Sequence, residues 1–221
     1  MEKQKKVFIM GDSYSTFRGY NPEGYRCYYG DNRENAPVVG SVEKTWWMRL
    51  AKQWDYRIVL NDSYSGSTVC NTVRPDLPLS SSFVNRLDRY MQDGFFRTNE
   101  IGLAFIFGGT NDSWLECPIG TLTYSDWTEA DLLCVLPAFC YLLHGYTEIA
   151  GIPQTVVVIN TELKPEIVEN MVLACRHYGV DCVKLSGIDK KYGHPTELGM
   201  EQIACQLSRH LTNYNGTDVV G

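Results

Sequence analysis

The sequence predicts a three-layer α/β/α fold built around a five-stranded parallel sheet. Two observations support this prediction: short apolar runs recur along the chain, and helical patterns separate them. The apolar runs cover residues 6–10, 56–60, 101–107, 154–160 and 180–185. Because this alternation is typical of a doubly wound sheet, we expect the strand order 2-1-3-4-5 with helices on both faces.

The first two helices are indicated by apolar residues at four-residue spacing. Tryptophan and leucine recur in this way over residues 44–54, where Thr45 is suited to cap the N-terminus. Residues 80–91 show the same spacing from Phe83 to Met91. Both patterns predict helices that bury one face.

The later helices carry capping or turn residues at their ends. Thr128 and Asp131 resemble a capping box at the start of a helix over residues 127–146, which we expect Pro137 to kink or split. Pro165 suits the first turn of a helix over residues 164–180. A last helix is expected over residues 197–211, followed by a loose tail.

Length and composition place limits on what the protein is. A chain of 221 residues without an internal linker predicts one domain, residues 1–221, with a core over about residues 6–211. A formal net charge of −6 argues against nucleic acid or an anionic membrane surface as the main partner. No run reaches the roughly 18 apolar residues that span a bilayer. The apolar run after the basic start is also too short for a signal peptide, so we expect a cytoplasmic protein, or an exported one if a signal segment has been removed.

The cysteines and the missing motifs exclude several other classes of protein. Cys134, Cys140, Cys175 and Cys205 fall in helical apolar patterns, which favours buried free thiols. There is no CxxC, no HExxH and no phosphate-binding glycine loop. We therefore expect no metal, no cofactor and no nucleotide.

Polar turns follow the first three predicted strands and resemble one another. Residues 12–15 and 62–65 both read DSYS, and residues 108–114 read GGTNDSW. In the predicted strand order, the first strand lies between the second and the third, so these turns should meet at one edge of the sheet. Two long connections, residues 16–44 and 113–125, follow the same edge, where open α/β sheets bind ligands. We expect Asp12 and Asp112 to accept hydrogen bonds from backbone amides within these turns.

With these turns, the chain resembles the SGNH (GDSL-like) hydrolases, which are esterases and lipases with a flavodoxin-like sheet. The matching blocks are Gly11-Asp12-Ser13, Gly66, Gly109-Thr110-Asn111-Asp112, and GHPTELGM around His194. The blocks occur in the family's order and span nearly the whole chain, from residue 6 to about residue 211.

The resemblance implies a role for each matched residue. Ser13 would be the nucleophile and His194 the base that takes its proton. The backbone amides of Ser13 and Gly66 and the side-chain amide of Asn111 would form the oxyanion hole. Asparagine suits the last position because it donates without carrying a negative charge.

The last block departs from the family pattern. The family places an aspartate three residues before the histidine, where this chain has Lys191. The nearest acid is Asp189, five residues before His194, and it is our candidate for the residue that orients the imidazole. The alternative is a Ser–His dyad whose ring is held by a backbone carbonyl or by water.

The resemblance also sets the expected function, a serine esterase that removes short acyl groups, such as acetyl, from a carbohydrate. Trp114, Tyr14 and Tyr25 are the candidate substrate contacts, and the other tyrosines of the first long connection, Tyr20, Tyr28 and Tyr29, either cover the core or line the pocket. A lysophospholipase or a thioesterase on the same fold is the nearest alternative. A carbohydrate-binding protein without activity is the alternative of another class.

Overall fold

The computed structural model describes residues 4–31, 34 and 36–217, and its central sheet has the predicted topology. Five parallel strands lie in the order β2-β1-β3-β4-β5, so the predicted order is confirmed. The strands are β1 (Lys6–Gly11), β2 (Arg57–Ser63), β3 (Leu103–Phe107), β4 (Thr155–Ile159) and β5 (Asp181–Lys184).

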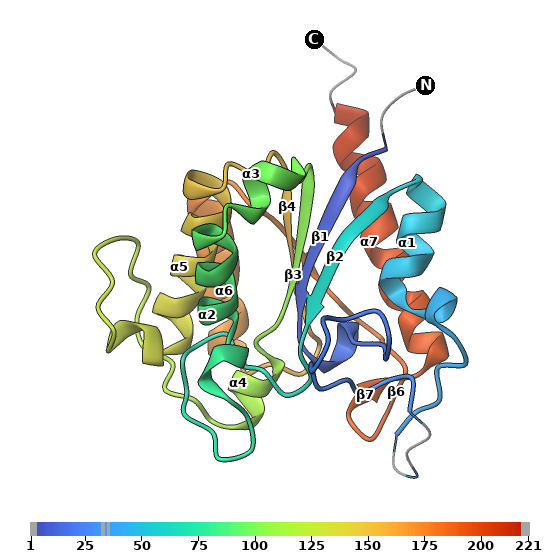
Figure 1. The fold of residues 1–221 in the computed structure, drawn as a ribbon, viewed down its shortest axis with the longest axis horizontal. Helices are drawn as coiled ribbons and strands as arrows, with labels where there is room; N and C mark the ends of the chain where they lie inside the picture. Colours follow the sequence, from blue (N-terminus) through green and yellow to red (C-terminus); the bar gives the residue numbers. More distant parts are fainter. Residues whose placement is uncertain (1–3, 32–33, 35, 218–221) are drawn as a thin grey trace.

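Helices cover both faces of this sheet (Figure 1). On one face lie α2 (Phe83–Gln92), α5 (Val135–His144) and α6 (Pro165–His177). On the other face α1 (Trp46–Trp54) packs beside α7 (Glu197–Thr217). A short helix, α3 (Phe95–Asn99), leads from α2 into β3.

The strands read as continuous apolar runs because both faces of the sheet are buried. In β1, Phe8 and Met10 pack with residues of α2, α5 and α6. Val7 and Ile9 point the other way and pack with residues of α1 and α7. Alternation along a strand therefore fills two cores rather than separating a core face from a solvent face.

Two of the predicted helix starts are confirmed, one by a capping contact and one by the position of a proline. The Thr45 hydroxyl accepts a hydrogen bond from the amide of Met48 at 3.4 Å at the start of α1. Pro165 is the first residue of α6, where its missing amide hydrogen has no intrahelical role.

The predicted helix over residues 127–146 begins later than expected. Thr128 and Asp131 do form a reciprocal capping box, with bonds of 2.8 and 3.2 Å, but the box begins a short 3-10 turn, Asp131–Leu133. The helix proper, α5, starts at Val135, so Pro137 lies in its first turn and costs no hydrogen bond. The expected segment is therefore split, but the split lies at Cys134 and the helix is not interrupted at Pro137.

Two smaller expectations were also wrong. The last helix does not end near residue 211 but continues to Thr217, and residues 218–221 lie outside the described part of the chain. Cys140 and Cys175 are buried as expected, whereas Cys134 is half-buried and Cys205 is exposed.

No described helix is both long and apolar enough to cross a membrane.

The carboxyl ends of the strands meet at one edge of the sheet (Figure 1). The 3-10 turn Ser13–Ser15 follows β1, and α4 (Thr110–Trp114) follows β3. A two-stranded hairpin, β6 (Lys190–Lys191) and β7 (His194–Pro195), lies at the same edge between β5 and α7. The described parts of the connection over residues 16–44 also run along this edge and include the 3-10 turn Val42–Lys44.

Candidate active site

Ser13 is held in a tight turn directly after β1. The Asp12 carboxylate accepts a hydrogen bond from the amide of Tyr14 at 3.0 Å, which caps the turn as expected for Asp12. Gly11 permits the turn because a Cβ at this position would lie 2.5 Å from the Ser63 hydroxyl oxygen. Strand and cap together fix the direction of the Ser13 side chain.

Burial gives Asp12 an unusual protonation equilibrium. Asp12 is fully buried, and removal from water raises its pKa to about 7, although the Thr110 side chain lowers it in part. The neighbouring carboxylate of Asp112 raises the pKa further, while the hydrogen bond from Tyr14 opposes the shift. Ionisation of Asp12 at this buried position therefore costs free energy, and its role is structural.

Ser13 and His194 form a hydrogen-bonded pair. The Ser13 Oγ atom lies 3.0 Å from His194 Nε2, and the Tyr192 carbonyl oxygen lies 3.0 Å from His194 Nδ1. A carbonyl oxygen can only accept, so Nδ1 carries the ring proton and Nε2 is free to accept the proton of the Ser13 hydroxyl. This is the tautomer that a general base needs.

His194 Nδ1 contacts a backbone carbonyl and not Asp189. The Asp189 carboxylate instead accepts a hydrogen bond from the Thr196 hydroxyl. The reason is the two-residue turn of the β6–β7 hairpin, in which Tyr192 and Gly193 both have positive φ, at 53° and 73°. That turn brings the Tyr192 carbonyl within hydrogen-bonding distance of His194 Nδ1. It also pairs His194 across the hairpin with Lys191, the position at which the family has its aspartate.

Two buried tyrosines anchor this hairpin to the rest of the fold. The Tyr14 hydroxyl donates to the Gly193 carbonyl at 2.5 Å, and the Tyr29 hydroxyl donates to the Pro195 carbonyl at 2.8 Å. Burial raises the pKa of both phenols, which keeps them protonated as donors. Tyr14 is fully buried, so its predicted role as a substrate contact does not fit the structure.

Aromatic rings enclose the imidazole of His194. Tyr28 stacks on it with ring centroids 3.6 Å apart and an interplanar angle of 7°. Trp114, at the end of α4, meets the same ring edge-on at 5.8 Å and is 43% exposed. The stack restricts rotation of the imidazole, while Trp114 presents an indole surface to solvent beside it.

The electrostatic surroundings keep His194 neutral. Burial lowers the pKa of His194 below its ordinary value, and the nearby positive charge of Lys190 lowers it further. The contact with the Tyr192 carbonyl acts in the opposite direction. Lys190 is itself held by Asn160 Oδ1 at 2.8 Å and by Glu162 at 3.3 Å.

Gly66 lies in a turn that only glycine adopts without strain. The amide of Ser67 donates to the Tyr64 carbonyl at 3.2 Å, which closes a four-residue turn with Gly66 in its third position at φ 90°. A Cβ on Gly66 would also lie 3.0 Å from a Leu77 methyl group. Within the described chain, the amides of Ser13 and Gly66 donate no hydrogen bond to a protein group, which leaves both available to a ligand.

Asn111 is linked to the same turn. Its side-chain Nδ2 donates to the Ser67 carbonyl at 2.9 Å, and its amide group has a second hydrogen to donate. The next residue, Asp112, accepts hydrogen bonds from the amides of Val69 and Cys70 at 2.9 and 3.2 Å, as expected for a turn-forming aspartate. The structure therefore places the Gly66 turn beside Asn111 through two successive residues of α4.

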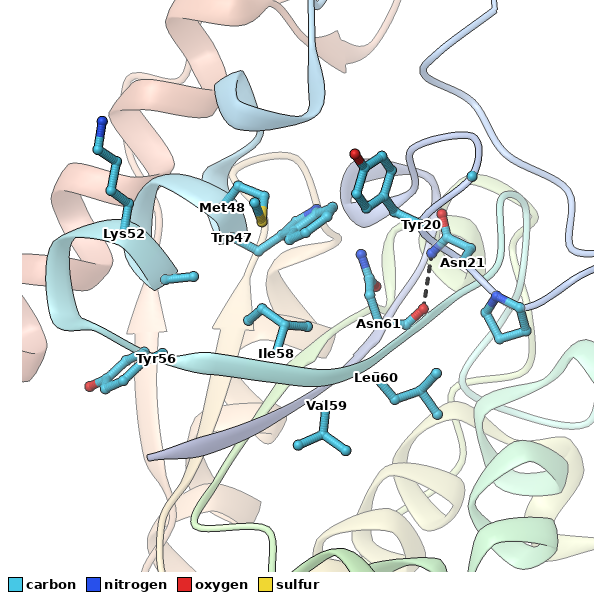
Figure 2. A pocket seen from close by; sticks show the side chains of 13 residues that line it. Tyr20, Asn21, Trp47, Met48, Lys52, Tyr56, Ile58, Val59, Leu60 and Asn61 are labelled. Atoms are coloured by element: carbon cyan, nitrogen blue, oxygen red, sulfur yellow. Dashed lines mark hydrogen bonds between the residues drawn. The ribbon is translucent and has the colours of Figure 1, made fainter. Parts of the chain in front are cut away.

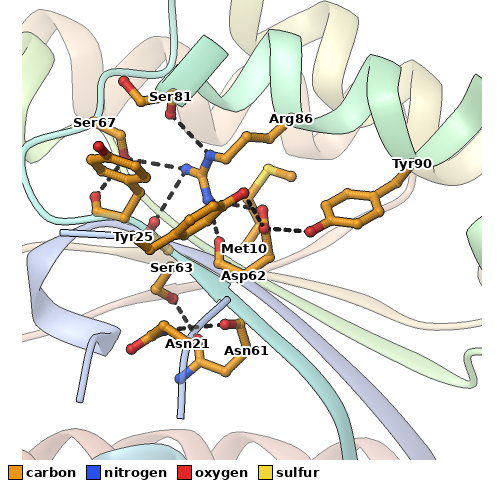
Figure 3. Close-up of polar contacts among 12 residues, drawn as sticks. Met10, Asn21, Tyr25, Asn61, Asp62, Ser63, Ser67, Ser81, Arg86 and Tyr90 are labelled. Carbon is orange, nitrogen blue, oxygen red and sulfur yellow. Dashed lines mark hydrogen bonds and ion pairs between the residues drawn. The ribbon is translucent and has the colours of Figure 1, made fainter. Parts of the chain in front are cut away.

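Tyr25 contributes to a buried polar network rather than to the Ser13–His194 pair. Its hydroxyl donates to Asp62 at 3.0 Å (Figure 3). The same hydroxyl accepts from Arg89 at 2.6 Å, and the ring packs against Tyr64. The half-buried Tyr25 ring contacts Tyr64, which belongs to the Gly66 turn, and the Tyr25 hydroxyl is already hydrogen-bonded to Asp62 and Arg89.

A separate pocket of about 710 Å³ lies outside this site, against the edge strand β2. Figure 2 shows the side chains that line it, which are mainly apolar. Trp47, Met48 and Ile58 form much of its wall. The side-chain amide of Asn61, at one end of the pocket, is already bonded to the Ser15 carbonyl and the Ser63 hydroxyl.

Among the described residues, one group could approach a metal ion. Cys70, Asp112 and Cys117 have ligand atoms within 4.8 Å of one another. The Asp112 carboxylate already accepts bonds from two backbone amides and from the Cys70 thiol, at 3.3 Å for the thiol. These bonds tie Asp112 to Val69 and Cys70, which follow the Gly66 turn, so a structural role accounts for the cluster.

Comparison with known proteins identifies the class that this fold and site define. The family described as GDSL-like Lipase/Acylhydrolase matches residues 5–211, so the chain belongs to that family and is a hydrolase. A crystal structure of a GDSL-like lipase from Bacteroides ovatus is 36% identical and superposes with a TM-score of 0.85, covering 96% of this chain and 100% of that one. Another from Bacteroides uniformis is 39% identical, also with a TM-score of 0.85, and covers 96% of this chain and 97% of that one.

A more distant structure shares the fold alone. It is a family two carbohydrate esterase from Cellvibrio japonicus, 15% identical with a TM-score of 0.61, covering 95% of this chain and 61% of that one. The comparison with curated proteins gives no match.

Two groups at this site were left unassigned by the sequence. Tyr28 was one of several tyrosines in a long connection without periodicity, so nothing distinguished it from its neighbours. A backbone carbonyl was the stated alternative partner of the imidazole, but the sequence did not indicate that it is the carbonyl of Tyr192. A signal was nevertheless present, because Gly193 follows Tyr192 between two short polar stretches, as in a two-residue hairpin turn.

Proposed function

We propose that this hydrolase is a serine esterase that works through a Ser13–His194 dyad. The observation that carries the proposal is the pair of contacts on the imidazole, 3.0 Å from Nε2 to the Ser13 hydroxyl oxygen and 3.0 Å from Nδ1 to the Tyr192 carbonyl. Together they supply a nucleophile, a base and the correct tautomer without a carboxylate.

The reaction follows from these contacts. Ser13 Oγ attacks the ester carbonyl carbon while its proton passes to His194 Nε2, and the carbonyl oxygen becomes an oxyanion. The amides of Ser13 and Gly66 and the side chain of Asn111 are the donors for that oxyanion. The imidazolium then gives its proton to the departing alcohol, which leaves an acyl group on Ser13.

Water completes the cycle by the reverse sequence of proton transfers. His194 takes a proton from water, the hydroxide attacks the acyl-enzyme, and the Ser13 oxygen leaves with the proton from Nε2. In both halves the transient imidazolium is stabilised by the Tyr192 carbonyl and by the face of Tyr28 stacked at 3.6 Å.

We propose short acyl esters of carbohydrates as the substrate class. Trp114 supports this choice because it is 43% exposed next to His194, where an indole face suits the packing of a sugar ring.

A chain-length series tests the reaction and the substrate class together. Hydrolysis of p-nitrophenyl acetate should exceed that of the decanoate ester, and Ser13→Ala should abolish both. Preference for the long chain, or for a thioester, would favour a lysophospholipase or thioesterase instead. Wild-type protein that binds acetylated oligosaccharides without cleaving any ester would show a binding protein.

A further inference from the structure

Arg86 is a fully buried cation on α2 that points at the ends of β1 and β2 (Figure 3). Its Nε donates to the Ser81 carbonyl at 2.9 Å, and its Nη1 donates to both the carboxylate, at 2.9 Å, and the carbonyl of Asp62. Its Nη2 donates to the Gly11 carbonyl at 3.2 Å and to the Ser67 hydroxyl at 3.1 Å. Each N–H of the guanidinium therefore has an acceptor.

The acceptors of Nη2 belong to the two halves of the proposed active site. Gly11 is the last residue of β1 and lies two positions before Ser13. Ser67 follows Gly66 directly, and its carbonyl accepts the 2.9 Å hydrogen bond from Asn111. One planar group thus joins the strand that carries the nucleophile to the turn that carries the oxyanion donors.

The partner of Arg86 extends this link to the histidine side of the site. The other Asp62 oxygen accepts from the hydroxyls of Tyr25 and Tyr90 at 3.0 and 2.6 Å. Tyr25 lies three residues before Tyr28, whose ring stacks on His194. Asp62 is as fully buried as Arg86, so the ion pair lies wholly inside the protein.

A buried ion pair is a poor device for stability alone. The desolvation of both charges offsets much of their attraction, and apolar replacements of similar volume are often as stable. What the guanidinium does provide is a rigid fork with fixed angles between its donors. A lysine has the charge but not the fork, so it cannot meet acceptors on three segments together.

We propose that Arg86 is a positioning residue that sets the distance between Ser13 and the oxyanion donors Gly66 and Asn111. The proposal rests on the proposed esterase mechanism. Arg86 has no contact with substrate in that mechanism and would act only through the residues that it positions. Its consequence is specific: loss of the fork should weaken binding of the transition state more than binding of the substrate.

The test compares Arg86→Lys with Arg89→Gln. Arg89 lies on the same helix and also contacts Asp62 and Tyr25, but it has no contact with Gly11 or Ser67. With p-nitrophenyl acetate, kcat per titrated active site should fall about 10- to 100-fold in Arg86→Lys with KM within about threefold. Affinity for phenylboronic acid, which forms a tetrahedral adduct with serine, should fall by a similar factor, while Arg89→Gln should keep both values.

The opposite result is equally clear. An Arg86→Lys protein with a lower Tm but unchanged kcat and boronate affinity would show that Arg86 only supports the fold. If Arg86→Lys does not fold, Ser67→Ala removes a single acceptor and should lower kcat about 3- to 10-fold, and an unchanged kcat would overturn the proposal. Failure of the esterase mechanism itself would appear separately, as activity that survives Ser13→Ala.

Discussion

Replacing Asp189 by asparagine distinguishes the two ways in which His194 could be oriented. In serine hydrolases whose histidine depends on a carboxylate, the same change lowers kcat by about 10⁴-fold, or about 5.5 kcal/mol. Here the Nδ1 proton goes to the Tyr192 carbonyl at 3.0 Å, and the Asp189 carboxylate is bonded to Thr196. We therefore expect kcat of Asp189→Asn to stay within about threefold, or about 0.7 kcal/mol.

The same substitution should have a measurable effect on stability. The Thr196 hydroxyl accepts from the amide of Gly199 at 3.2 Å at the start of α7, and Asp189 holds that hydroxyl in place. Weakening this cap should cost about 1 kcal/mol of the free energy of unfolding.

The assay is steady-state hydrolysis of p-nitrophenyl acetate, with urea unfolding measured on the same samples. His194→Ala provides the scale for complete loss of the base. A fall in kcat approaching 10⁴-fold in a stable Asp189→Asn protein would refute the dyad and restore the aspartate as the orienting group.

Three further predictions concern the pH response and the oxyanion hole. The acid limb of kcat/KM should have its midpoint below pH 6.5, because burial and the charge of Lys190 lower the pKa of His194. Lys190→Gln should move that midpoint upward. An unchanged pH profile would contradict the effect of Lys190 on the pKa of His194. Asn111→Ala should lower kcat about 10²- to 10³-fold with little change in KM, and a loss confined to KM would place Asn111 in ground-state binding instead. The folded pKa of Asp12, about 7, exceeds its unfolded value of 3.8, so the folded state binds more protons between these values and stability should fall as pH rises from 4 to 7. Urea unfolding of Asp12→Asn should show that decline reduced, by up to about 4 kcal/mol, and an unaltered decline would assign it to other groups.

Much of the fold could be predicted because its strands are buried on both faces. Such strands read as uninterrupted apolar runs, and their alternation with helical patterns leaves few topologies. Helix boundaries were harder to predict when one signal had two meanings. Pro137 would have broken a helix interior, but in the first turn of α5 it is harmless, and only the position of the start decides between these outcomes.

The candidate site could be predicted where its residues follow strand ends. Ser13, Gly66 and Asn111 each lie just beyond β1, β2 or β3, so the strand order alone brings them to one edge. His194 depends on a hairpin, and there the direction of the chain is set by backbone angles that spacing does not reveal. Sequence spacing therefore suggested Asp189 as the partner of His194, but the turn at Tyr192 and Gly193 leaves Asp189 bonded to Thr196 instead.

Arg86 illustrates a signal that was present in the sequence and not used. It lies on the apolar face of α2, between Phe83 and Tyr90, where a charge must find partners to be buried. Helical periodicity alone would have singled it out. Its acceptors could not have been predicted, because Gly11, Asp62 and Ser67 meet only when the sheet and the Gly66 turn are both formed.

The most direct test of the account is covalent labelling of Ser13. A fluorophosphonate should add once to the wild-type protein, and peptide mass spectrometry should place the adduct on Ser13. Labelling should disappear in Ser13→Ala and slow by orders of magnitude in His194→Ala, because the base 3.0 Å from the Ser13 oxygen activates it. An adduct on another residue, or hydrolysis that continues after Ser13 is blocked, would contradict the central claim.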